Sequence, residues 1–168
     1  MLNKTLALAL SDNFAESFID NVFKKNVTPE IGSIVYCELV FGIAEHSGVY
    51  IGNNKIVQLN GQGEIEAVSP EMFLERLDGF NTAISIYVSC NDEEAVGKKK
   101  IAKRAKKMIG EQRNYNLLSD NCHQFTSGCI TGDFENGDND FLSLKEKAES
   151  QLDADNWLVW ASDGGVYT

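Results

Sequence analysis

The spacing of hydrophobic positions predicts a series of β-strands in the first half of the chain. Apolar residues there alternate with polar ones or form short runs rich in β-branched and aromatic side chains. Asn53 and Asn54 interrupt this pattern, and asparagine tolerates the positive φ that a two-residue hairpin turn requires. We therefore expect strands within the following residues: 33–45, 46–52, 55–60, 61–68 and 82–90.

Other stretches carry apolar residues at helical spacing. Ser69 is suited to cap one of these helices, and Pro70 to occupy its first position. Gly110 is suited to end another. The predicted helices cover residues 11–25, 69–76 and 93–109, a segment that begins at Cys122, and residues 143–152.

These elements predict a single α+β domain over residues 1–168. Its core spans residues 29–132, with the helix 11–25 before it and an acidic extension, residues 133–168, after it. A chain of this length buries a sizeable core without help from metals or disulfides. The apolar stripe of the first helix is interpreted as core packing, and docking of a partner is the alternative.

The charge of the chain limits the partners that it can bind. It has 15 Lys and Arg against 25 Asp and Glu, a net charge of −10, which disfavours nucleic acid. Basic residues are concentrated in Lys98–Lys107, opposite the apolar face of the predicted helix 93–109. We interpret this basic face as solvated, and the alternative is transient contact with anionic lipid head groups or an acidic partner.

Targeting signals are weak in this sequence. Residues 5–10 form only a short apolar stretch, followed at once by polar residues, which does not match a secretory signal. The sequence has no apolar run long enough to span a membrane. We therefore expect a cytoplasmic location, and export as an effector is the alternative.

The four cysteines have no CxxC spacing, and the chain has only two histidines. A structural zinc site is therefore not expected, and we predict no metal or other cofactor. Without a secretory signal, the thiols are expected to be free. Cys37 and Cys90 lie in apolar strands and Cys129 lies two turns into a helix, so we interpret these three as buried structural residues.

Cys122 differs from the other three because it stands at a predicted helix start, directly after Asp120 and Asn121. The N–H groups of a first helical turn favour negative charge and lower the pKa of a cysteine there. The same groups can hold a developing oxyanion. Cys122 is therefore the candidate nucleophile, and Asn121 marks the helix start that would stabilise the oxyanion.

A catalytic thiol needs an imidazole base, and the chain offers His46 and His123. His123 follows Cys122 directly and lies about 100° around the helix from it, so the two do not share a face. His46 is therefore the candidate base. Gln58 and Asn60 lie on one side of the next strand, and the hairpin brings Gln58 roughly opposite His46. We expect Gln58 to orient the imidazole, with Asn60 as the alternative.

The segment around His46, followed later in the chain by the segment around Cys122, resembles the LRAT-like family (lecithin:retinol acyltransferase-like proteins) of papain-like, NlpC-type thiol enzymes. The resemblance covers about residues 29–132 and rests on AEHSGVYIGNNKIVQLN and YNLLSDNCHQFTSGCITG. The first motif follows a Pro–Gly opening at Pro29 and Gly32, and its histidine begins a strand that ends in Tyr-x-Gly. The second contains the Asn-Cys-x-x-Phe helix start.

The resemblance implies a circularly permuted papain-like (NlpC-type) fold with an antiparallel sheet packed against the nucleophile helix. It also implies a covalent acyl-enzyme on Cys122, with His46 acting as base and then as acid. Lipid acyl esters are the leading substrates, and peptide amides are the alternative.

Two positions depart from the family pattern. Animal LRAT-like enzymes carry a second histidine where this chain has Gln58, and Glu-His is common where it has His123 and Gln124. A glutamine orients an imidazole but carries no charge, so it stabilises an imidazolium less than a carboxylate does. Two classes of function therefore stay open: a thiol-dependent hydrolase or acyltransferase, and an inactive binding or regulatory domain of the same fold.

Overall fold

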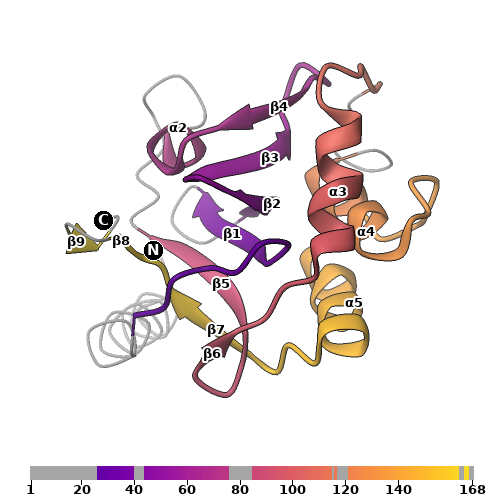
Figure 1. Cartoon of the computed structure of the whole chain (residues 1–168). Coiled ribbons are helices and arrows are strands. Elements are labelled where there is room, and N and C mark those ends of the chain that lie inside the picture. The colour runs from indigo at the N-terminus through magenta and orange to yellow at the C-terminus, as the bar shows by residue number, and fades with distance from the viewer. Residues whose placement is uncertain are drawn as a thin grey trace, which may run out of the picture.

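The computed structural model describes residues 26–39, 44–75, 85–114, 116, 121–162 and 165–166 (Figure 1). The predicted helix 11–25 lies outside these residues. The strands are β1 (Ile34–Leu39), β2 (Ala44–Gly52), β3 (Lys55–Leu59), β4 (Ile65–Val68), β5 (Ile86–Asn91), β6 (Glu94–Ala95), β7 (Asn156–Val159), β8 (Ala161–Ser162) and β9 (Gly165–Val166). The helices are α2 (Pro70–Leu74), α3 (Lys99–Met108), α4 (Cys122–Thr131) and α5 (Phe141–Leu152).

The main sheet has the strand order β4-β3-β2-β1-β5-β6, and β7 also pairs with β5. Neighbouring strands of this sheet are antiparallel. Helices α3, α4 and α5 lie along one side of the sheet, and α2 lies apart from them beside β3 and β4 (Figure 1). The predicted α+β class, with an antiparallel sheet packed against the helix that begins at Cys122, is confirmed.

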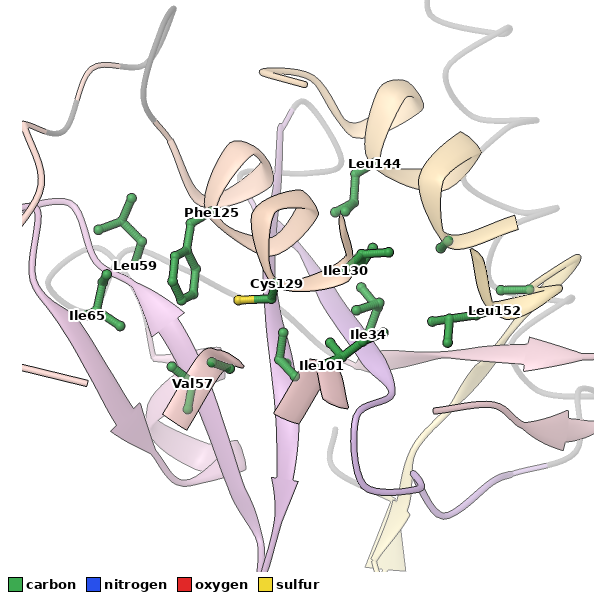
Figure 2. Close-up of a cluster of buried hydrophobic side chains, with 14 residues drawn as sticks. Ile34, Val57, Leu59, Ile65, Ile101, Phe125, Cys129, Ile130, Leu144 and Leu152 are labelled. Carbon is green, nitrogen blue, oxygen red and sulfur yellow. The ribbon is translucent and has the colours of Figure 1, made fainter. Parts of the chain in front are cut away.

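The main hydrophobic core lies between the sheet and helices α3, α4 and α5 (Figure 2). Phe125 of α4 is fully buried against side chains of β3 and β4, while Ile130 and Leu144 join α4 to α5 and β1. Each such side chain contributes roughly 1.5–3 kcal/mol through burial. This core fixes α4 across the strands that carry His46 and Gln58.

A second cluster covers the other face of the sheet. Phe73 of α2 and Trp160 are its largest side chains, and both are almost fully buried. Successive side chains of a strand point to opposite faces, so Val49 of β2 joins the core under α4 whereas Tyr50 joins the second cluster. The hydrophobic runs of these strands reflect burial on both faces.

The turn predicted at Asn53 and Asn54 is confirmed. Their φ values are 53° and 50°, the left-handed conformation at both central positions of a two-residue turn. The turn pairs β2 with β3 and sets Val49 opposite Val57. The short helix capped by Ser69 is confirmed as well, because its side chain accepts from the Met72 N–H at 3.3 Å.

Some element boundaries were predicted wrongly. The single strand expected over residues 33–45 is divided between β1 and β2, so His46 is the third residue of a strand that begins at Ala44. The helix expected from residue 93 begins only at Lys99, and Glu94 and Ala95 form β6 instead.

Tertiary contacts explain the late start of α3. The segment before it pairs with β5, where the Val96 N–H donates to the Ser89 carbonyl at 2.9 Å. Its backbone then passes close to another segment: a Cβ on Gly32 would lie 2.0 Å from the Lys98 carbonyl oxygen. The spacing of apolar residues does not reveal such a contact, because the contact involves backbone that is distant in sequence.

The acidic extension contributes to the same core. Helix α5 begins at Phe141, two residues before its predicted start, because Asp140 caps it by accepting from the Ser143 N–H at 2.9 Å. Leu144 and Leu152 of α5 are buried, and β7 extends the main sheet beside β5. The predicted core 29–132 is thus completed by α5 and β7.

Candidate active site

Cys122 is the first residue of α4, as predicted, and only 5% of its surface is exposed. Asn121 caps the helix: its Oδ1 accepts from the N–H groups of His123 at 3.0 Å and Gln124 at 3.2 Å. The position places the Cys122 thiol at the positive end of the helix dipole, where a thiolate is favoured.

The Asn121 side chain is occupied on both sides. Its Nδ2 donates to the Asn139 carbonyl at 2.6 Å, while its oxygen serves as the cap. Two backbone N–H groups of the first turn, those of His123 and Gln124, are therefore used for capping. The observed role of Asn121 is therefore to define the helix start.

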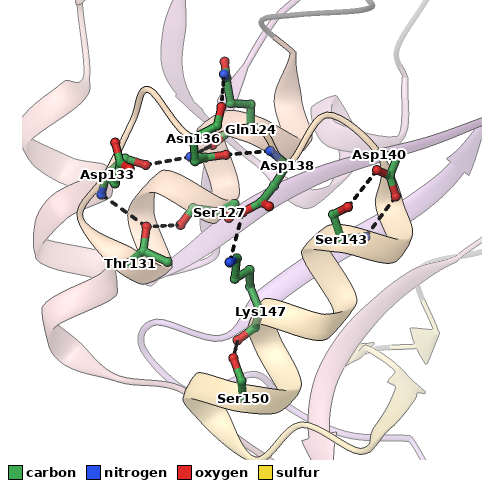
Figure 3. A network of polar contacts seen from close by, with 10 residues as sticks. All are labelled: Gln124, Ser127, Thr131, Asp133, Asn136, Asp138, Asp140, Ser143, Lys147 and Ser150. Carbon is green, nitrogen blue, oxygen red and sulfur yellow. Dashed lines mark hydrogen bonds and ion pairs between the residues drawn. The ribbon is translucent and has the colours of Figure 1, made fainter.

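The acidic segment after α4 folds back on the outer side of this helix (Figure 3). Asp138 accepts from the Ser127 hydroxyl and lies 3.9 Å from the Lys147 ammonium of α5. The Asn136 amide donates to the Gln124 carbonyl at 3.1 Å. These bonds attach the beginning of α4 to the following loop and to α5.

His46 and Gln58 meet as predicted. His46 Nε2 and Gln58 Oε1 lie 2.9 Å apart, and each side chain is 3% exposed. The imidazole also lies against the Phe73 ring, with the two ring centroids 4.8 Å apart. Burial and these two contacts restrict the orientation of the imidazole.

Asn60 has a different role from the one considered for it. Its Oδ1 accepts from the N–H groups of Gln62 at 3.0 Å and Glu64 at 2.9 Å, so it closes the turn before β4. Its Nδ2 donates to Glu66 Oε1 at 3.0 Å. Gln58, and not Asn60, is the residue that hydrogen-bonds to the imidazole.

Helix α4 is joined to β2 beside His46. His123 Nδ1 lies 3.0 Å from the Ser47 hydroxyl, and Ser47 in turn donates to Thr126 at 3.1 Å. His123 also bonds to the backbone of Glu45. The start of α4 is thus held against the face of β2 that Ser47 presents, whereas the side chain of the neighbouring His46 is directed toward Phe73 and the second cluster.

Burial lowers the pKa of His123 to about 4, although the carboxylate of Asp140 and the bond to the Glu45 backbone act in the opposite direction. His123 is therefore neutral near pH 7. A neutral imidazole has one donor and one acceptor nitrogen. This suits the contacts of His123 with Glu45 and Ser47, the residues before and after His46 in the chain. The sequence did not indicate this anchoring role.

The other three cysteines, all in the described part of the chain, form no disulfide and are buried. Burial raises the pKa of Cys90 to about 11 and raises the pKa of Cys129 far above its usual range. The Cys37 thiol lies 3.8 Å from the Phe73 carbonyl. These environments fit the structural roles predicted for the three residues.

Glu66 was not identified from the sequence. It stands directly opposite Gln58 in the β3–β4 pair, and Gln58 Nε2 donates to its Oε1 at 3.1 Å. The alternation of the two predicted strands could have indicated this neighbour.

Among the described residues, no group of three or more His, Cys, Asp or Glu side chains is placed to hold a metal ion.

Comparison with known proteins assigns the family. The family model described as lecithin retinol acyltransferase matches residues 27–135, which include β1 to β5, α3 and α4. No curated protein matches the chain. In the part of the chain that the structure describes, no helix is both long enough and apolar enough to cross a bilayer.

The matched residues contain the histidine strand and the cysteine helix, and they cover more than half of the chain. The family consists of thiol enzymes of the acyltransferase and hydrolase type with a papain-like, NlpC-type fold. The chain belongs to the lecithin retinol acyltransferase family.

Proposed function

We propose that this protein is a thiol-dependent acyl hydrolase or acyltransferase in which Cys122 is the nucleophile, His46 the base and Gln58 the residue that orients the base. The observation that supports this best is the buried 2.9 Å bond between His46 Nε2 and Gln58 Oε1. An amide oxygen only accepts hydrogen bonds, so this bond favours a proton on Nε2 and leaves Nδ1 as the basic nitrogen.

In the proposed reaction, His46 Nδ1 accepts the Cys122 proton and the thiolate attacks the acyl carbonyl carbon. The positive end of α4, which Asn121 defines, stabilises both the thiolate and the tetrahedral oxyanion. The intermediate collapses to a Cys122 thioester while the imidazolium protonates the leaving oxygen or nitrogen. Water or a second acceptor, deprotonated by His46, then releases the acyl group.

The order of these residues in the chain, with the histidine strand before the cysteine helix, supports the circularly permuted papain-like arrangement. We propose that the substrate is a lipid acyl ester, in keeping with the family, rather than a peptide amide. We also propose that the protein is cytoplasmic, and export is the alternative.

Thiol reactivity tests the catalytic proposal. Near neutral pH, iodoacetamide should alkylate Cys122 much faster than Cys37, Cys90 or Cys129, because burial holds the Cys90 and Cys129 thiols protonated. The His46→Ala variant should slow this alkylation. Peptide mapping by mass spectrometry gives the four rates, and protein unfolded in urea serves as the control in which all four thiols react. Equal rates in the folded protein would overturn the proposal.

The substrate class needs its own experiment. With phospholipid, the protein should accumulate a mass adduct on Cys122 that hydroxylamine removes, as expected for a thioester. Labelling by amide probes alone would replace the lipid substrate by a peptide amide. Absence of both adducts, with Cys122 no more reactive than the other thiols, would favour the inactive binding domain.

Helix α3 supports a proposal about membrane contact. Its apolar residues Ile101, Ala102 and Ala105 are buried, and lysines from Lys99 to Lys107 are exposed. Arg104, the other basic residue of α3, is instead partly buried, and it donates to the carbonyl of Ile130, near the end of α4, at 2.7 Å. We propose that the lysines contact anionic lipid head groups transiently. Charge reversal at Lys103 and Lys107 should weaken binding to phosphatidylserine vesicles, and unchanged binding would contradict the idea.

A further inference from the structure

We infer that Glu66 is a positioning residue for His46: it fixes the side-chain amide of Gln58 so that His46 keeps its proton on Nε2. This inference rests on the proposed function, in which Nδ1 is the basic nitrogen. It concerns a carboxylate that does not touch the imidazole and acts through the intervening glutamine.

The contacts form a short chain that is buried at His46 and Gln58 and partly exposed at Glu66. Gln58 bonds to His46 at 2.9 Å through Oε1 and donates through Nε2 to Glu66 Oε1 at 3.1 Å. Asn60 Nδ2 donates to the same Glu66 oxygen at 3.0 Å, which holds the carboxylate in place. His46, Gln58 and Asn60 are at most 7% exposed, so little water competes for the bond between His46 and Gln58.

The two ends of a glutamine amide are nearly equal in size but opposite in hydrogen bonding. Gln58 alone could therefore present either its oxygen or its NH₂ group to the imidazole. An ionised carboxylate only accepts, so Glu66 requires the NH₂ group on its own side. The amide oxygen must then face His46 Nε2, which has to donate, and Nδ1 is left as an acceptor.

Glu66 also supplies the charge that Gln58 lacks. When His46 accepts the thiol proton it becomes an imidazolium, and a carboxylate two hydrogen bonds away stabilises that positive charge more than a neutral side chain would. The pair Gln58–Glu66 therefore offers both the geometry and part of the electrostatic support that a single charged orienting residue would give.

The tautomer of His46 can be measured directly by NMR of protein labelled with ¹⁵N-histidine. The chain has only two histidines, and a His46→Ala sample assigns their signals. We expect the wild type to hold the proton on Nε2 and Glu66→Gln to show a mixture of both tautomers, because an amide partner allows Gln58 to turn over. A His46 tautomer unchanged in Glu66→Gln would overturn the inference.

Glu64 provides a matched control. Its carboxylate accepts from the same Asn60 amide, at 3.3 Å, and Glu64→Gln removes the same charge while the bond between Gln58 and Glu66 remains. This variant should keep the wild-type tautomer. A mixture in Glu64→Gln equal to that in Glu66→Gln would assign the effect to general charge and overturn the inference.

Kinetics give a second readout. Glu66→Gln should lower kcat by about 10-fold with little change in KM, as is typical for residues that orient a catalytic group. Glu66→Asp, which keeps the carboxylate, should restore part of the loss and serves as the second variant if Glu66→Gln folds poorly. Equal kcat for Glu66→Gln and wild type would contradict the inference.

The tautomer measurement does not depend on turnover. A protein that shows the expected tautomer change but forms no acyl adduct would refute the proposed function and leave the positioning role of Glu66 intact. An active enzyme without the tautomer change would refute only the role of Glu66.

Discussion

The two sides of the candidate site are held by different kinds of contact. The strand side, His46, Gln58 and Glu66, lies in consecutive antiparallel strands, and hydrogen bonds between neighbouring strands fix its geometry. The helix side, Asn121, Cys122 and His123, is fixed by partners outside α4, among them Ser47 and Asn139. Local pairing therefore sets the imidazole, whereas tertiary packing sets the position of the thiol.

This difference predicts that the helix side is the more easily displaced of the two. The strand side belongs to one continuous stretch of chain around a two-residue turn, so it forms once the hairpin forms. The helix side requires the core under α4, the loop 133–139 and the contact with β2 to form together. Substitutions at four positions test this comparison, from the largest expected effect to the smallest.

Removal of a core side chain should disturb the helix side most. Phe125→Ala leaves a cavity under α4 and should lower the free energy of unfolding by about 3–5 kcal/mol. Chemical denaturation measures the loss. The His46 tautomer should stay as in the wild type, since Phe125 does not belong to the strand side. A changed tautomer in folded Phe125→Ala would show that the two sides are not independent.

His123 should make the helix side sensitive to acid. Its pKa is about 4 in the folded protein and about 6.5 when unfolded, so between these values the unfolded state binds more protons. This contribution to stability is present above about pH 6.5 and is lost as the pH falls to about 4, by about 3 kcal/mol in total.

His123→Gln, which does not titrate, should remove that part of the pH dependence. Urea denaturation of both proteins at several pH values between 4 and 7 measures the difference. Parallel stability curves for wild type and variant would show that His123 is not protonated selectively on unfolding.

Loss of Gln58 should affect chemistry more than stability. Gln58→Ala removes the acceptor of the His46 proton and should lower kcat roughly 10²-fold, with a smaller change in KM. Glu64→Gln, in the turn between β3 and β4, serves as the control. Wild-type turnover in Gln58→Ala would show that the imidazole keeps its orientation without the bond to Gln58.

Substitution of Asn121, the cap of α4, should have the smallest effect on the protein. Asn121→Ala removes the acceptor for two first-turn N–H groups and should lower stability by about 1–2 kcal/mol. Asn121→Asp keeps that acceptor but adds a negative charge beside Cys122, so it should retain more stability and yet slow alkylation of the thiol. Faster alkylation in Asn121→Asp than in the wild type would contradict the proposed electrostatic role of the helix start.

Much of the strand side could be predicted from the sequence. Two adjacent asparagines with positive φ define a two-residue turn, and this turn, together with side-chain alternation, predicted the meeting of His46 and Gln58. The same alternation would have predicted Glu66, had the pairing of the next strand been followed. The residue pattern also located the helix start at Cys122 because capping is local.

Tertiary structure decided the features whose partners are distant in sequence. The late start of α3 depends on the fit of residues 97 and 98 against Gly32, and β7 joins β5 only in the folded sheet. His123 is neutral because it is buried, and its contacts with β2 join segments about 77 residues apart. Local patterns encode turns, caps and faces, because these depend on neighbouring residues. The attachment of the thiol helix to the imidazole strand depends on burial and long-range packing, which only the assembled fold provides.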